Sequence, residues 1–279
     1  MYNASSMRDT LLRRELDGIE IAYRTVGVAS DPAVVFLHGW ASSRRMWESA
    51  QLHLGKAYTS IALDLPGHGD SGKPDWTWYT IPRFADLVAD FVRDLGLRRP
   101  VLIGHSMGGT IALELASRPG LAWAGVVAVN PVVSGRVYSR VIPLRDEWVD
   151  SAVRVSRRVW PTASRLLTRP PQAVRRHAPD HFLRNTEDLG TATADSVLGS
   201  MRAVLTWDLR GSLSNVRAKT LVIVGSADRV VSPAEGESAA AEIPGARLVR
   251  LAAAHHPHDE APAAFYPHLE SFLAEAAVL

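Results

Sequence analysis

Short apolar runs recur along the chain, and several of them end at a glycine, histidine or aspartate. Five runs are apolar almost throughout rather than alternating with polar residues: 34–37, 60–64, 101–103, 126–129 and 221–224. An uninterrupted apolar run is typical of a strand that is buried on both faces of a parallel sheet. The runs therefore predict five such strands, and a further strand is predicted at 247–251.

The segments between these runs carry the periodicity of amphipathic helices. In the clearest case, apolar residues recur at intervals of three and four positions: Phe84, Leu87, Val88, Phe91, Val92 and Leu95. Pro82 suits the first turn of this helix, and Gly96 suits its end. Further elements are predicted as helices at 106–117, 235–242 and 262–276, and as an antiparallel hairpin at 16–28. Strands that alternate with helices indicate an α/β fold, with a mostly parallel sheet and helices on both faces.

Residues 134–209 interrupt this rhythm. They contain no clear buried strand, and prolines at positions 161, 170, 171 and 179 break the segment. Because the apolar strand pattern resumes only after it, we interpret the segment as a mostly helical insertion. Residues 1–133 and 210–279 then form the core of the protein.

The composition is that of an ordinary globular protein, with 47% hydrophobic and 22% charged residues among 279. The chain has no cysteine, which excludes disulfides, thiolate metal ligands and a cysteine nucleophile. No apolar run reaches the roughly 18 residues that span a bilayer, and the first residues do not resemble a signal peptide. We therefore expect a cytoplasmic protein without a membrane partner. A net charge of +2 is too small to indicate nucleic acid as a partner.

The first candidate for chemistry is the sequence Gly104-His105-Ser106-Met107-Gly108. This G-x-S-x-G pattern follows a predicted strand and opens a predicted helix, which is the context that a nucleophile elbow requires. The helix N-terminus places backbone N–H groups and a partial positive charge beside the serine hydroxyl. The alternative is a glycine-rich turn with an inactive serine.

A nucleophilic serine needs a base and a carboxylate that orients the base. Asp228 follows the predicted strand at 221–224, and His255 and His256 follow the one at 247–251. His256 is a rival base and His258 a weaker one, while Asp228 has the alternative of capping a helix. Three histidines this close also raise the question of a metal site, but no H-E-x-x-H pattern accompanies them.

Four motifs together resemble the α/β-hydrolase superfamily of serine hydrolases over nearly the whole chain. They are Phe36-Leu37-His38-Gly39-Trp40, the turn Asp64-Leu65-Pro66-Gly67-His68-Gly69-Asp70-Ser71, the Ser106 elbow, and the loops at 228–233 and 255–262. The resemblance implies that Ser106 is the nucleophile, His255 the base and Asp228 its carboxylate partner, because the H-x-P-x-x-E-x-P register selects His255. It implies an oxyanion hole formed by the backbone N–H groups of Trp40 and Met107, with no cofactor and no metal.

By the same resemblance, residues 134–209 form a cap over the active site. Arginines outnumber acidic residues between positions 136 and 184, and we expect either a solvated face or recognition of an anion by Arg140, Arg154, Arg157 and Arg158. The expected substrate-binding residues are Trp40, His105, Trp148 and Trp160. We expect a carboxylic ester hydrolase acting on a small acyl substrate. The alternatives are a thioesterase or an ester hydrolase for an acidic acyl-carrier protein, a cofactor-free perhydrolase, and a slow-turnover ligand-binding relative.

Overall fold

A sheet of eight strands forms the centre of the computed structural model, which describes residues 11–29, 32–135, 146–168, 171–176 and 178–277. The strands are β1 (Leu12–Leu16), β2 (Ile19–Val26), β3 (Val34–Leu37), β4 (Ser60–Leu63), β5 (Val101–His105), β6 (Gly125–Val129), β7 (Lys219–Gly225) and β8 (Arg247–Leu251). Their order across the sheet is β1-β2-β4-β3-β5-β6-β7-β8. Only the pairs β1–β2 and β2–β4 are antiparallel. The predicted mostly parallel sheet and its six predicted strands are confirmed.

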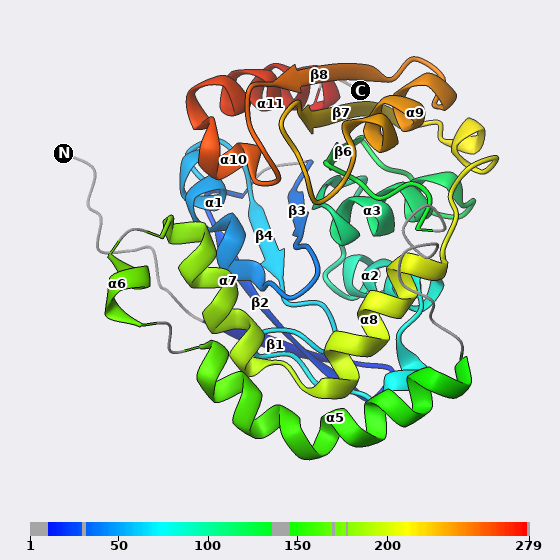
Figure 1. The fold of residues 1–279 in the computed structure, drawn as a ribbon. Helices are drawn as coiled ribbons and strands as arrows, with labels where there is room; N and C mark the ends of the chain where they lie inside the picture. The colour runs from blue at the N-terminus through cyan, green and yellow to red at the C-terminus, as the bar shows by residue number, and fades with distance from the viewer. Residues whose placement is uncertain (1–10, 30–31, 136–145, 169–170, 177, 278–279) are drawn as a thin grey trace.

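Helices cover both faces of this sheet (Figure 1). Outside the segment between β6 and β7, they are α1 (Glu48–Leu54), α2 (Ile81–Asp94), α3 (Met107–Ser117), α9 (Pro233–Glu242), α10 (Pro257–Glu260) and α11 (Pro262–Ala277). Val35 and Leu37 of β3 pack into the core that contains α2 and α3. Val34 and Phe36 pack into the opposite core, with α1 and α11. Successive residues of a strand point to opposite faces, so two buried faces require an uninterrupted apolar run.

The N-terminal hairpin differs from its prediction at 16–28. It is formed by β1 and β2 around Asp17 and Gly18, both of which have positive φ. The hairpin therefore begins at Leu12 and ends at Val26. β1 lies at the edge of the sheet and is almost entirely exposed, so it lacks the apolar pattern by which buried strands are recognised.

The described residues between β6 and β7 are mostly helical, as the sequence predicts for 134–209. They form α5 (Asp146–Leu167), α6 (Gln172–Arg175), α7 (Asp180–Thr191) and α8 (Ala194–Thr206). These helices gather on one side of the sheet, and α5, which contacts both α7 and α8, runs along the lower edge of the view (Figure 1). Among the described helices, none has the length and apolar character needed to cross a membrane.

Candidate active site

Ser106 stands at a sharp turn between β5 and α3. Its backbone has φ 51° and ψ −116°, a conformation that residues with a side chain rarely adopt. A Cβ on Gly104 would lie 2.1 Å from the carbonyl oxygen of Gly108, and one on Gly108 would lie 2.3 Å from that of Leu37. The turn is therefore closed so tightly that only glycine fits at these two positions, and it holds Ser106 at the N-terminus of α3.

Asp228 and His255 come from the loops after β7 and β8. Nδ1 of His255 donates a hydrogen bond to Oδ2 of Asp228 at 2.7 Å, and the Asp228 side chain is completely buried. Oδ1 of Asp228 accepts the backbone N–H groups of Val230 and Val231 at 2.8 and 3.0 Å. A proton held on Nδ1 leaves the lone pair of Nε2 free, which is the form of histidine that accepts a proton from a hydroxyl.

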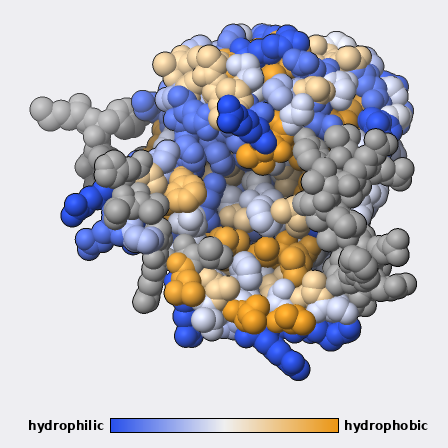
Figure 2. Space-filling model, in the orientation of Figure 1, coloured by the Kyte–Doolittle hydropathy of each residue, from blue (hydrophilic) through white to orange (hydrophobic). Residues whose placement is uncertain are grey.

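Ser106 and His255 line the same pocket, which has a volume of about 430 Å³. Trp40, His105 and Met107 line it as well, so the structure brings these five predicted site residues together. The opposite wall comes from α7 and α8, which belong to the segment that the family resemblance predicts as a cap; the individual wall residues were not predicted from the sequence. Figure 2 shows this face of the molecule hollowed near its centre, with apolar side chains below the hollow.

The two tryptophans predicted from the inserted segment have a different outcome. The indole N–H of Trp160 donates to the carbonyl oxygen of Ala192 at 2.7 Å, at the junction between α7 and α8. Trp160 lines a second hollow together with Arg157 and Asp195, away from Ser106. The predicted contact of Trp160 with substrate is therefore not supported, because its side chain is used to join two helices. The side chain of Trp148 lies outside the part of the structure that is described.

Two arginines of the predicted patch bind neighbouring side chains of the protein. Arg157 forms ion pairs with Asp195 and Asp75 at 2.5 and 2.9 Å, and Arg154 donates to the hydroxyl of Ser151. Arg140 lies outside the described residues. None of the described arginines of the inserted segment lines the pocket of Ser106. Arg154, Arg157 and Arg158 are exposed, which agrees with a solvated helical face, the first of the two alternatives from the sequence.

The peptide that carries His255 is held by two side chains from neighbouring strands. Its carbonyl oxygen accepts hydrogen bonds from Nε2 of His105 at 2.6 Å and from Nδ2 of Asn130 at 3.0 Å. Oδ1 of Asn130 accepts the N–H of Gly225 at 2.8 Å. Asn130 thus links the ends of β6, β7 and the histidine loop.

Glu260 holds the other side of the same peptide. Its carboxylate accepts the backbone N–H of Ala254 and, at 3.1 Å, that of His256. The glutamate of the H-x-P-x-x-E-x-P motif therefore has a structural role, which is to keep the histidine loop in one conformation. The motif named this residue, but only the fold reveals what it binds.

Burial keeps the other histidines of the pocket neutral. Desolvation, reinforced by neighbouring histidines, lowers the pKa of His256 to about 3 and that of His105 well below its usual value. The rings of these two residues stack with their centroids 4.9 Å apart. Asp228 bonds to His255 rather than to His256, so the geometry favours His255 as the base.

One group of described residues has the composition of a metal site. His256, His258 and Asp259 offer ligand atoms that lie within 4.8 Å of one another. Arg184, however, already pairs with the Asp259 carboxylate at 2.6 Å. A cation bound there would have to compete with this guanidinium, so the group fits a metal ion poorly.

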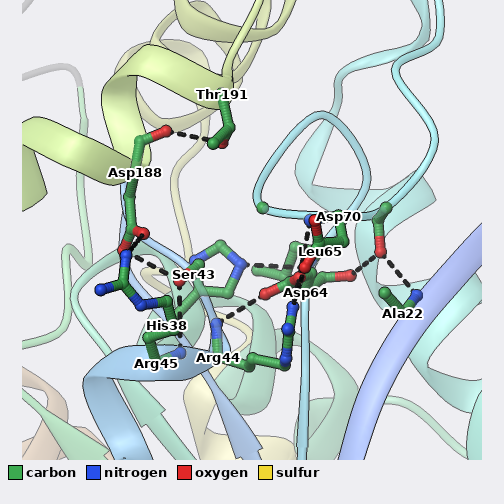
Figure 3. Close-up of polar contacts among 12 residues, drawn as sticks. Ala22, His38, Ser43, Arg44, Arg45, Asp64, Leu65, Asp70, Asp188 and Thr191 are labelled. Atoms are coloured by element: carbon green, nitrogen blue, oxygen red, sulfur yellow. Dashed lines mark hydrogen bonds and ion pairs between the residues drawn. The ribbon is translucent and has the colours of Figure 1, made fainter. Parts of the chain in front are cut away.

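The loop after β3, which carries Trp40, is fixed to the core by His38 (Figure 3). Nε2 of His38 accepts the N–H of Leu65 at 2.9 Å, so its proton lies on Nδ1, which donates to the carbonyl of Gly39 at 2.7 Å. Burial lowers the pKa of His38 to about 4. His38 is therefore a neutral group that orients the loop.

The same loop is bound to the inserted helices. Ser43 and Arg45 both donate to the carboxylate of Asp188 in α7, at 2.8 and 3.1 Å (Figure 3). The indole N–H of Trp40 donates to the carbonyl oxygen of Val197 in α8 at 3.0 Å. The loop next to Ser106 and the two helices that wall the pocket thus form one connected unit.

Comparison with known proteins agrees with this architecture. Residues 34–267 match the alpha/beta hydrolase family. The chain is 32% identical to the non-heme chloroperoxidase CPO-A1 of Kitasatospora aureofaciens, over 83% of this chain and 86% of that protein. It is 25% identical to 3-oxoadipate enol-lactonase 2 of Acinetobacter baylyi, over 95% and 96% of the two chains. Among solved structures, a thermophilic esterase from Thermogutta terrifontis has a TM-score of 0.77 at 25% identity, covering 96% of this chain and 99% of its own. The chain belongs to the alpha/beta hydrolase family.

Proposed function

We propose that this protein hydrolyses carboxylic esters through an acyl-enzyme, with Ser106 as nucleophile, His255 as base and Asp228 as its orienting carboxylate. The observation that carries the proposal is that Ser106, strained at the start of α3, lines one pocket with a histidine whose Nδ1 is bound to a buried carboxylate. In this proposal the helices of residues 134–209 act as the cap that walls the pocket.

In the proposed reaction, Oγ of Ser106 attacks the ester carbonyl while Nε2 of His255 takes the hydroxyl proton. The oxyanion is stabilised by the backbone N–H groups of Met107 and Trp40, each worth about 3 kcal/mol in the transition state. His255 then gives its proton to the departing alcohol. Water, deprotonated by His255, attacks the acyl-enzyme; His255 then returns this proton to Oγ of Ser106 as the carboxylic acid leaves.

The test is a panel of chromogenic esters and thioesters assayed with the native chain and with Ser106→Ala. We expect ester turnover that Ser106→Ala reduces by at least about a thousandfold, together with covalent labelling of Ser106 by a fluorophosphonate. Preferred cleavage of thioesters would replace the proposal with a thioesterase, and a preference for carrier-bound acyl groups would bring in the acidic carrier protein as partner. An unlabelled serine with slow turnover would indicate a ligand-binding relative.

A matched pair of variants tests the choice of base. His255→Gln should abolish ester turnover, because the glutamine side chain cannot take the proton from Ser106. His256→Gln removes a neutral histidine that does not contact Asp228, and it should retain most of the turnover. The reverse result would assign the role of base to His256.

A second candidate activity is perhydrolysis, which the similarity to a chloroperoxidase favours. Here hydrogen peroxide replaces water in the second step, so that the acyl-enzyme yields a peracid and free Ser106. Peracid formed from an ester and hydrogen peroxide by the native chain, but not by Ser106→Ala, would establish this activity. Lactones, suggested by the lactonase relative, belong in the ester panel because their cleavage uses the same steps.

A further inference from the structure

We propose that the pocket selects uncharged substrates, namely esters or lactones with an apolar chain, and discriminates against esters that carry an ionised carboxylate. The inference rests on the proposed function and concerns the chemical class of its substrate. It matters because the family includes a protein named for 3-oxoadipate, a dicarboxylic acid, as well as plain esterases.

The walls of the pocket are mainly aliphatic. α8 contributes Met201, Val204 and Leu205, α7 contributes Leu189, and Val132 follows β6. Such a surface binds a hydrocarbon chain by removing both from water, at roughly 0.8 kcal/mol per buried methylene. A volume of about 430 Å³ lies within the range of ordinary small-molecule sites.

The rim of the pocket has the same character. Phe182 of α7 is 46% exposed and Val230, in the loop after β7, is 63% exposed, and both line the pocket. Large apolar side chains left exposed at a site entrance favour a ligand that covers them with apolar surface of its own.

Among the described residues, none that lines the pocket is an arginine or a lysine. Two of the histidines that line the pocket, His105 and His256, do not supply the missing positive charge, because burial lowers the pKa of each well below neutral pH. Arg184, next to the pocket residue Asn185, is already paired with Asp259 at 2.6 Å. An ionised carboxylate that enters this pocket would lose its hydration, and no described residue of the pocket offers a positive charge to replace it. Its binding free energy is therefore unfavourable.

Neutral hydrogen-bonding groups are present instead. The amide of Asn185 makes only long contacts, accepting from the Ser42 hydroxyl at 3.4 Å and facing Nε2 of His256 at 3.4 Å. Contacts of this length are weak, so the amide can exchange them for an uncharged carbonyl or hydroxyl of a substrate. The described residues of the pocket can therefore bind uncharged polar groups of a substrate, but they offer no positive charge for a carboxylate.

The test compares three substrates with the same leaving group: p-nitrophenyl butyrate, mono-p-nitrophenyl succinate, and methyl p-nitrophenyl succinate. The first two have four-carbon acyl groups and differ in the terminal carboxylate, and the third masks that carboxylate as a neutral ester. At pH 8 we expect kcat/KM for the butyrate to exceed that for the succinate monoester by about 100-fold. The methyl ester should recover most of this loss.

A variant pair isolates charge from size. Thr186 lines the pocket from α7, and Thr186→Lys should raise kcat/KM for the succinate monoester relative to the butyrate by about tenfold. Thr186→Gln, which adds length without charge, should leave that ratio unchanged. A native ratio within about threefold, or no shift in Thr186→Lys, would overturn the inference while leaving ester hydrolysis intact. If the native chain cleaves no neutral ester faster than Ser106→Ala does, the proposed function itself fails.

Discussion

Replacing Asn130 by aspartate tests whether the clamp on the histidine loop serves catalysis. Asn130→Asp keeps the size of the side chain and the oxygen that accepts the N–H of Gly225 at 2.8 Å. It replaces the amide N–H groups that donate to the carbonyl oxygens of His255 and Ala254, at 3.0 and 3.2 Å, with a carboxylate oxygen that cannot donate. It also keeps a residue type that tolerates the φ of 45° at this position.

The magnitude follows from these contacts. Each lost hydrogen bond contributes about 1 kcal/mol, so the two together destabilise the fold by about 2 kcal/mol, or about 4–8 °C in Tm for a chain of this size. The His255 carbonyl keeps its bond from His105 at 2.6 Å, so the loop should shift rather than unfold. A displacement of the base by about 1 Å is enough to lower kcat by about 10- to 100-fold.

The assay measures Tm, kcat and KM on one chromogenic ester, together with the rate of labelling by a fluorophosphonate. We expect kcat and the labelling rate to fall together while KM changes little, because the pocket walls from α7 and α8 are untouched. Asn130→Ala serves as a control that also leaves the N–H of Gly225 unpaired, and it should lower Tm further. If Asn130→Asp lowers Tm but keeps kcat within twofold of the native value, Asn130 only stabilises the fold and does not position His255.

Two further perturbations follow from buried contacts elsewhere. Burial lowers the folded-state pKa of His38 to about 4 and that of His68 to about 3. Below about pH 6.5 these two histidines are therefore protonated in the unfolded chain but not in the native state. Because protons bind preferentially to the unfolded chain, the free energy of unfolding falls as the pH drops toward 4. These two histidines together should lower the free energy of unfolding by about 4 kcal/mol between pH 7 and 5, and the lowered pKa values of His105 and His256 add to this loss. Urea unfolding at the two pH values measures it, and equal free energies of unfolding would contradict it. Trp40→Phe removes the bond to the Val197 carbonyl and should raise KM several-fold with a smaller change in kcat, since it loosens the α8 wall; an unchanged KM would show that this bond does not shape the pocket.

The fold was predictable to the extent that burial leaves a local mark on the sequence. Strands such as β3 are covered on both faces, so their apolar runs are uninterrupted and visible without any tertiary information. β1 lies exposed at the sheet edge, has no such mark, and its start at Leu12 was missed. The elbow at Ser106 was predictable because Gly104 is needed to avoid a clash with Gly108, only four residues away. Gly108 is the exception, because the atom that a side chain there would meet belongs to Leu37 of another strand.

The inserted segment shows where local patterns stop being informative. Its helices were predicted from the absence of strands, but periodicity reports only that a helix has a buried face. It does not say whether that face meets another helix, as Trp160 does, or lines the pocket, as Leu189 does. For this reason the sequence did not reveal that Trp160 lies in a different hollow from Ser106, or which residues of α7 and α8 line the pocket.

The sequence by itself determined the α/β sheet, the serine elbow and the order in which the candidate acid and histidine follow it, because those features depend on neighbouring residues and on a recurrent set of motifs. Only the tertiary structure decided which residues of the inserted helices wall the pocket, and that Asn130 and Glu260 hold the histidine loop. Those properties rest on contacts between strand ends and loops, such as Asn130 with a carbonyl 125 positions along the chain. Such pairings are set by the packing of the whole sheet, which no local pattern encodes.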